Sequence, residues 1–166
     1  MVSYGITKND NQIIEKIIAR STGDETYFFR STSLHVLPKS AFNLDHWIKQ
    51  LLDDNTIFFT LFDSNNSETN VTSFISLSYQ NAVASLSVIC PNESYEPKLL
   101  NLAIQHSVEY AFKTQNMQRI YVYARDDGEV LKDVLCQNHF ELEARFTEAY
   151  WNNDKFIDID VFALLR

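Results

Sequence analysis

Glycine, proline and cysteine are scarce in this sequence: its 166 residues include three Gly, three Pro and two Cys. Few backbone positions with a positive φ can therefore be supplied by Gly. Two Cys are too few for a disulfide-rich scaffold, and we expect Cys90 and Cys136 to be reduced thiols. Hydrophobic residues make up 45% of the chain, with twelve Phe and eight Tyr to fill a core. This length and composition predict one globular domain over residues 1–166.

Basic residues and long apolar runs are also lacking. The chain has 14 Lys and Arg against 22 Asp and Glu, a formal net charge of −8, so we expect no nucleic-acid and no anionic-membrane partner. No apolar run approaches the length of a membrane span, and the first ten residues lack the apolar core of a secretory signal. We therefore predict a cytoplasmic protein. The His and Cys residues show no metal-ligand spacing, so no metal is expected.

Hydrophobic periodicity divides the chain into alternating helical and extended segments. Apolar residues at helical spacing predict helices near residues 10–20, 44–52, 97–113 and 130–137. Runs rich in β-branched and aromatic residues predict strands near residues 2–6, 56–62, 71–79, 82–90, 119–124, 140–149 and 156–165. The polar segments 63–70 and 150–155 are expected to be a loop and a hairpin connection. The predicted class is α+β.

The second half of the chain carries motifs that resemble a known family. The helix after residue 97 contains Ala103 and ends in Tyr110-Ala111-Phe112, and the next strand begins with Arg119-Ile120. The last helix is followed by His139-Phe140-Glu141 where that family has Gly-Phe-Glu, and Asp158 precedes an apolar final strand. These residues and the element order resemble the GNAT acyltransferases, most closely the branch that acetylates ribosomal-protein N-termini. The motifs cover residues 82–166, whereas residues 1–81 fit only by element order.

This resemblance implies a GNAT-like domain with a central twisted mixed sheet of about six or seven strands, flanked by about four helices. It also implies an N-acyltransferase that moves an acyl group from acetyl-CoA or another acyl thioester to an amine. The acceptor would be an amine-bearing small molecule or a peptide N-terminus. A homodimer or another protein partner also fits the family.

The implied site lies where the third meander strand leads into the central helix. In GNAT enzymes the strand backbone holds the pantetheine arm of the donor, and the loop before the helix holds its diphosphate. The corresponding donor-binding positions here are Val88, Ile89, Cys90, Tyr95, Lys98 and Leu99. Tyr123 as proton donor and Asp126 as base are the candidate catalytic residues. Core packing for Tyr123, helix capping for Asp126 and an amphipathic surface position for Tyr95 are the structural alternatives.

The sequence departs from the family at the positions that carry its chemistry. The family loop reads Arg/Gln-x-x-Gly-x-Gly/Ala, and here Glu93, Glu96 and Lys98 occupy the Gln and glycine positions. Pro97 between them has no N–H to donate to a phosphate. Leu135 stands where a Tyr usually protonates the leaving thiolate. Two alternatives therefore stay open: a catalytically inactive GNAT-fold binding or regulatory protein, and an acyltransferase whose donor is bound to a carrier protein.

Overall fold

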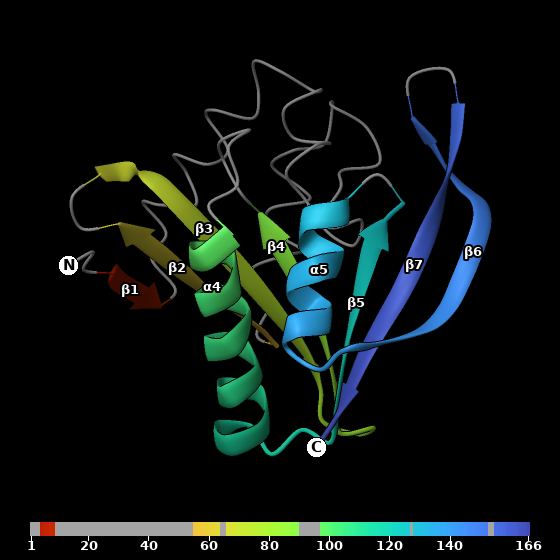
Figure 1. The fold of residues 1–166 in the computed structure, drawn as a ribbon. Coiled ribbons are helices and arrows are strands. Elements are labelled where there is room, and N and C mark those ends of the chain that lie inside the picture. Colours follow the sequence, from red (N-terminus) through yellow and green to blue (C-terminus); the bar gives the residue numbers. More distant parts are fainter. Residues whose placement is uncertain (1–3, 9–54, 64–65, 90–96, 127, 153–154) are drawn as a thin grey trace.

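A mixed β-sheet of seven strands forms the frame of the protein (Figure 1). The computed structural model describes residues 4–8, 55–63, 66–89, 97–126, 128–152 and 155–166. The strands are β1 (Tyr4–Lys8), β2 (Thr56–Asp63), β3 (Asn66–Ser78), β4 (Val83–Ile89), β5 (Arg119–Arg125), β6 (Glu141–Asn152) and β7 (Lys155–Leu165). Their order in the sheet is β1-β2-β3-β4-β5-β7-β6. Only β4 and β5 run parallel, and the other neighbouring pairs are antiparallel.

Two α-helices cover one face of this sheet within the described residues (Figure 1). They are α4 (Pro97–Glu109), which continues as the π-helix η3 (Tyr110–Thr114), and α5 (Glu129–Gln137). These elements confirm the predicted α+β class, the mixed sheet and the two later helices. The two helices predicted near residues 10–20 and 44–52 lie outside the described residues.

The hydrophobic core fills the space between the sheet and these helices. Alternate residues of β5 (Ile120, Val122 and Ala124) point into it, and each is at most 1% exposed. Leu100 and Ile104 of α4 pack against them and are equally buried. Burying each large aliphatic side chain contributes about 1.5–3 kcal/mol relative to exposure, so this layer fixes the position of both helices on the sheet.

Two strand boundaries differ from the prediction for one physical reason. The segment 63–70 was expected to be a loop, yet β3 already begins at Asn66, and Asn70 pairs with Phe62 beyond a bulge. Likewise 150–155 was expected to be the hairpin connection, yet the ladder continues as far as Asn152 opposite Lys155. Asn, Ser and Thr favour turns because their side chains compete for the backbone, but a hairpin ladder pairs the backbone of any residue.

The scarcity of Gly shows in the backbone of the turns. Among the residues that the structure describes, four non-Gly residues have a positive φ: Ala82, Asn116, His139 and Glu148. His139 stands where the family motif has Gly, directly after α5, with a φ of 65°. Its N–H donates to Cys136 O and the N–H of Phe140 to Leu135 O, both at 3.0 Å, which is a Schellman-type helix end. A side chain there costs roughly 1–2 kcal/mol relative to Gly.

Candidate active site

The sheet opens between its two parallel strands. β4 and β5 pair only over three residues each, Val83–Ser85 against Arg119–Tyr121. Beyond that point β4 stays paired with β3 as far as Ile89, and β5 stays paired with β7 as far as Arg125. The ends of β4 and β5 therefore separate, as Figure 1 shows, and the sheet divides into a β1–β4 half and a β5–β7–β6 half.

The sequence-predicted site residues fall on both sides of this divergence. Val88 and Ile89 are the last residues of β4, and the side chain of Val88 is 2% exposed. Tyr123 lies on β5 and is half-buried, with its ring in an edge contact with Tyr121 at 5.5 Å between centroids. Asp126 follows the end of β5. The divergence therefore brings the end of β4, where the sequence analysis expects the donor, and the catalytic candidates to one end of the sheet.

The start of α4 supplies the remaining described positions. Lys98 is exposed in its first turn, which holds no acidic residue. Leu99 is 0% exposed and belongs to the core, so it anchors the helix rather than offering a side chain to a ligand. Cys90 and Tyr95 lie outside the described residues.

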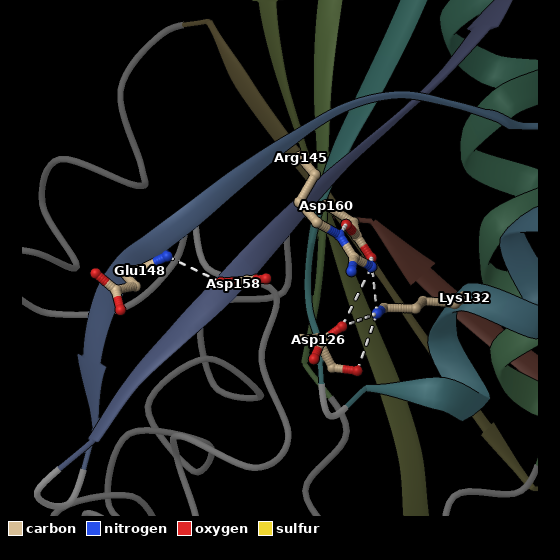
Figure 2. A network of polar contacts seen from close by, with 6 residues as sticks. All are labelled: Asp126, Lys132, Arg145, Glu148, Asp158 and Asp160. Carbon is tan, nitrogen blue, oxygen red and sulfur yellow. Dashed lines mark hydrogen bonds and ion pairs between the residues drawn. The ribbon is translucent and has the colours of Figure 1, made fainter.

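A network of four charged side chains stands at the end of β5 (Figure 2). Asp160 of β7 is 1% exposed and accepts hydrogen bonds from Arg145 of β6, through Nε at 2.6 Å and Nη2 at 2.9 Å. Lys132 of α5 approaches the same carboxylate at 2.7 Å and Asp126 Oδ1 at 3.2 Å. Arg145 Nη2 also reaches Asp126 Oδ1, at 3.2 Å. Two carboxylates, from β7 and from the turn after β5, thus face two cations, from α5 and β6.

The network is electrostatically favourable for its buried member. The hydrogen bonds from Arg145, and after them those from Lys132, hold the pKa of Asp160 below its usual range in spite of burial. The same contact with Asp160 raises the pKa of Arg145. Asp160 is therefore a charged carboxylate at neutral pH, and its charge is matched locally.

Asp126 is held by its main chain as well as by its carboxylate. Its N–H donates to Asp158 O at 3.0 Å, and its C=O accepts a hydrogen bond from Lys132 Nζ at 2.9 Å. Both contacts to its carboxylate use Oδ1. Figure 2 also shows a second link between the last two strands, in which the N–H of Glu148 donates to Asp158 Oδ1 at 2.9 Å.

Sequence reasoning identified Asp126 but missed its partners Lys132, Arg145 and Asp160. A signal was present: Asp160 interrupts the apolar run of β7, and a carboxylate in a buried strand needs a cation nearby. The identity of that cation depends on the pairing of β6 with β7, which places Arg145 opposite Asp160 in the stretch between two register shifts. Nothing in the linear sequence gives that register.

Three further findings concern metal binding, membrane spans and the position of Leu135. Within the described part of the chain, no group of three or more His, Cys, Asp or Glu side chains is arranged to hold a metal ion. No helix among those residues combines the length and the hydropathy that crossing a bilayer requires. Leu135, at the position of the family's proton-donating Tyr, is 0% exposed in the core.

The sheet order, the divergence of β4 from β5 and the helices that follow each strand define a GNAT-like fold. No protein-family model and no curated protein matches the chain, but solved structures do. Mutant forms of the spermidine/spermine N-acetyltransferase SpeG from Vibrio cholerae superpose with a TM-score of 0.75 and 15% identity, over 98% of this chain and 93% of that one. A chimera of the V. cholerae spermidine N-acetyltransferase with hSSAT gives a TM-score of 0.73 and 16% identity, over 97% and 96%.

A dodecameric structure of the V. cholerae spermidine N-acetyltransferase also matches, with a TM-score of 0.73 and 16% identity over 98% of this chain and 93% of that one. At such identities the likeness shows a shared fold. These structures are spermidine N-acetyltransferases and not ribosomal-protein N-acetyltransferases, so the likeness supports the GNAT-like fold and gives no support to the narrower branch.

Proposed function

We propose that this protein is an N-acyltransferase that moves an acyl group from a thioester donor to the amine of a small cationic acceptor. The observation that carries the proposal is the divergence of β4 from β5 in a fold shared with spermidine N-acetyltransferases. Acetyl-CoA is the first donor to test, and a polyamine is the first acceptor. The net charge of −8 agrees with a cationic acceptor, because an acidic protein concentrates cations near its surface.

The described residues fit the thioester arm of such a donor better than its diphosphate. An extended pantetheine is an amide chain, and the end of β4 at Val88 and Ile89 offers strand backbone beside the divergence. The diphosphate has less support. Helix α4 begins with Pro97, which lacks an N–H, and Lys98 is the one cation of its first turn. In the sequence, Glu93 and Glu96 add negative charge to the segment just before it.

The reaction itself asks little of the side chains. The amine nitrogen forms a bond to the acyl carbon, the carbon–sulfur bond breaks, the nitrogen loses a proton and the sulfur gains one. Holding the two reactants in contact supplies most of the acceleration in such a transfer. We assign the proton for the sulfur to the Tyr123 hydroxyl and the acceptance of the amine proton, through water, to Asp126.

A second candidate is a non-catalytic GNAT-fold protein that binds a ligand or a partner protein. One observation favours it: Leu135 fills the proton donor's usual position with a buried aliphatic side chain. With Glu93, Glu96 and Pro97, Leu135 makes several adverse changes at sequence positions to which the resemblance assigns the chemistry of the family. An acyl donor that is bound to a carrier protein would not need a site for the CoA diphosphate. The protein could then still be an acyltransferase.

Calorimetric titration separates these candidates. Acetyl-CoA, free CoA and pantetheine are titrated in parallel into the purified protein, followed by acetyl transfer to spermidine measured by thiol release. Micromolar binding of acetyl-CoA with transfer supports the proposal. Binding of pantetheine without CoA points to a carrier-bound donor. Absence of binding by all three overturns the acyltransferase and leaves the non-catalytic candidate.

A further inference from the structure

Each N–H donor of the Lys132 ammonium has an acceptor within the network. It has three N–H donors, and three oxygens lie within reach: Asp160 Oδ2 at 2.7 Å, Asp126 O at 2.9 Å and Asp126 Oδ1 at 3.2 Å. Its side chain is only 17% exposed. A surface lysine would move freely in water, so this one is fixed by its contacts.

These contacts act where β5 has no support from β4. After Tyr121 the two strands no longer pair, so the course of β5 depends on β7 and on what α5 adds. The N–H of Asp126 is held by Asp158 O of β7, and its C=O and carboxylate are held by Lys132 of α5. The end of β5 is therefore fastened from both sides to its own half of the sheet.

Arg145 completes this arrangement from the edge strand. It ties β6 to β7 through Asp160 and reaches Asp126 as well, so β5, α5, β6 and β7 meet in one charge-balanced cluster (Figure 2). Among the described residues, the ion pairs of this cluster join only groups outside the β1–β4 half of the sheet. The cluster therefore links the end of β5, α5, β6 and β7 to one another.

We infer that Lys132 is a positioning residue: by fixing the end of β5 to α5 and β7 it sets the separation of β4 and β5, and with it the place of the Tyr123 hydroxyl. The inference rests on the proposed function, since the donor is what occupies that separation. Lys132 acts through β5 and does not itself touch the reacting atoms.

The test compares Lys132→Met with two matched controls. Met keeps the length and apolar stem of Lys and removes the three donors. Lys113→Met removes the cation of an exposed ion pair on η3, and Ser107→Ala removes a buried hydroxyl that bonds Ser73 in the other half of the sheet. Ser107→Ala should also lower the stability of the protein, as Lys132→Met does, but it leaves the charged network intact. Each variant is titrated with acetyl-CoA or, if the wild type binds only pantetheine, with pantetheine.

We expect Lys132→Met to weaken donor binding about tenfold, which corresponds to about 1.4 kcal/mol of binding free energy, while the KM for the amine acceptor stays unchanged. Amide exchange of residues 122–126 should rise in this variant alone. Both controls should bind the donor as the wild type does. Equal donor affinity in Lys132→Met and Ser107→Ala would overturn the inference.

A wild-type protein that binds none of the probes would refute the proposed function instead. In that case, amide hydrogen exchange alone tests whether Lys132 fixes the end of β5. A selective rise at residues 122–126 in Lys132→Met keeps Lys132 as the residue that fixes the end of β5. Equal amide exchange of residues 122–126 in Lys132→Met and Ser107→Ala would show that Lys132 does not have this role.

Discussion

Replacing Asp160 by Asn tests how much the charged network contributes to stability. The carboxylate accepts from Arg145 Nε at 2.6 Å and Nη2 at 2.9 Å and lies 2.7 Å from Lys132 Nζ. Asn keeps one oxygen, so either orientation turns an N–H₂ group toward a donor and leaves two cations without their anion. Removing one partner of a buried ion pair costs about 3–5 kcal/mol. Because water still reaches Lys132 and Arg145, whose side chains are 17% and 46% exposed, we expect the lower end, about 3 kcal/mol.

Urea denaturation at pH 7 measures this difference, with Glu109→Gln as the control. Glu109 belongs to an exposed ion pair with Lys113, so Glu109→Gln should cause no measurable change in the urea midpoint. For a chain of this size, about 3 kcal/mol corresponds to a Tm lower by roughly 6–12 °C. A loss below about 1 kcal/mol would refute the reasoning, because it would mean that the network's attraction only offsets its desolvation.

The pH dependence gives a second and independent reading. The pKa of Asp160 is lowered in the folded protein, so its charged form favours folding. Its contribution is complete above the unfolded pKa of about 3.9 and is lost as the pH falls through the lower folded pKa. The stability gap between the wild type and Asp160→Asn should therefore be constant from pH 7 to about pH 5 and close below about pH 4. A gap that persists unchanged into strong acid would assign it to packing instead of charge.

Four further substitutions test separate parts of the account. Tyr123→Phe should lower kcat at least about 100-fold and leave donor affinity unchanged, and an unaltered kcat would remove its role as proton donor. His139→Gly should raise the free energy of unfolding by about 1 kcal/mol in urea, because it relieves the positive φ after α5; a loss would contradict that reading. Ser107→Ala should cost about 1–3 kcal/mol, since it leaves the buried Ser73 hydroxyl without its 2.7 Å partner, and a neutral result would show that Ser73 re-pairs. Burial lowers the pKa of His106, so the folded state disfavours its protonation and stability should fall as the pH drops below about 6.5. His106→Gln should flatten that fall between pH 8 and 5, and an identical slope in both proteins would assign it to another group.

The sequence predicts the framework well because hydrophobic periodicity is local. The helix that begins at Pro97 and the strand Arg119–Arg125 follow directly from apolar spacing, and the structure places both as predicted. The errors fall where composition replaced periodicity, at Asn66–Asn70 and Tyr150–Asn152. Polar side chains were read there as turn formers, although the ladder with the facing strand extends through them.

The site is only half predictable for a different reason. The ends of β4 and β5 are sequence-local, so Val88, Ile89 and Tyr123 could be placed beside the implied donor position. The partners of Asp126 come from α5, β6 and β7, and Arg145 meets Asp160 only because the register of β6 shifts between Phe146 and Tyr150. A one-residue slip would turn Arg145 to the other face of the sheet. Contacts of that kind are fixed by three-dimensional pairing and leave little trace in spacing.

The two candidate functions make opposite demands on this geometry. A binding protein derived from an enzyme would have no need to fix the end of β5, and burying the Asp160 carboxylate is costly because its charge must be desolvated. Yet the chain keeps four charged groups at the end of β5, where they link that end to α5, β6 and β7. Three of the adverse changes, Glu93, Glu96 and Pro97, fall in the sequence segment that the resemblance assigns to the diphosphate. A strand end that suits a thioester arm, together with a loop sequence that disfavours a diphosphate, agrees with the proposed acyltransferase with an unusual donor, so the comparison of pantetheine with CoA is the decisive one.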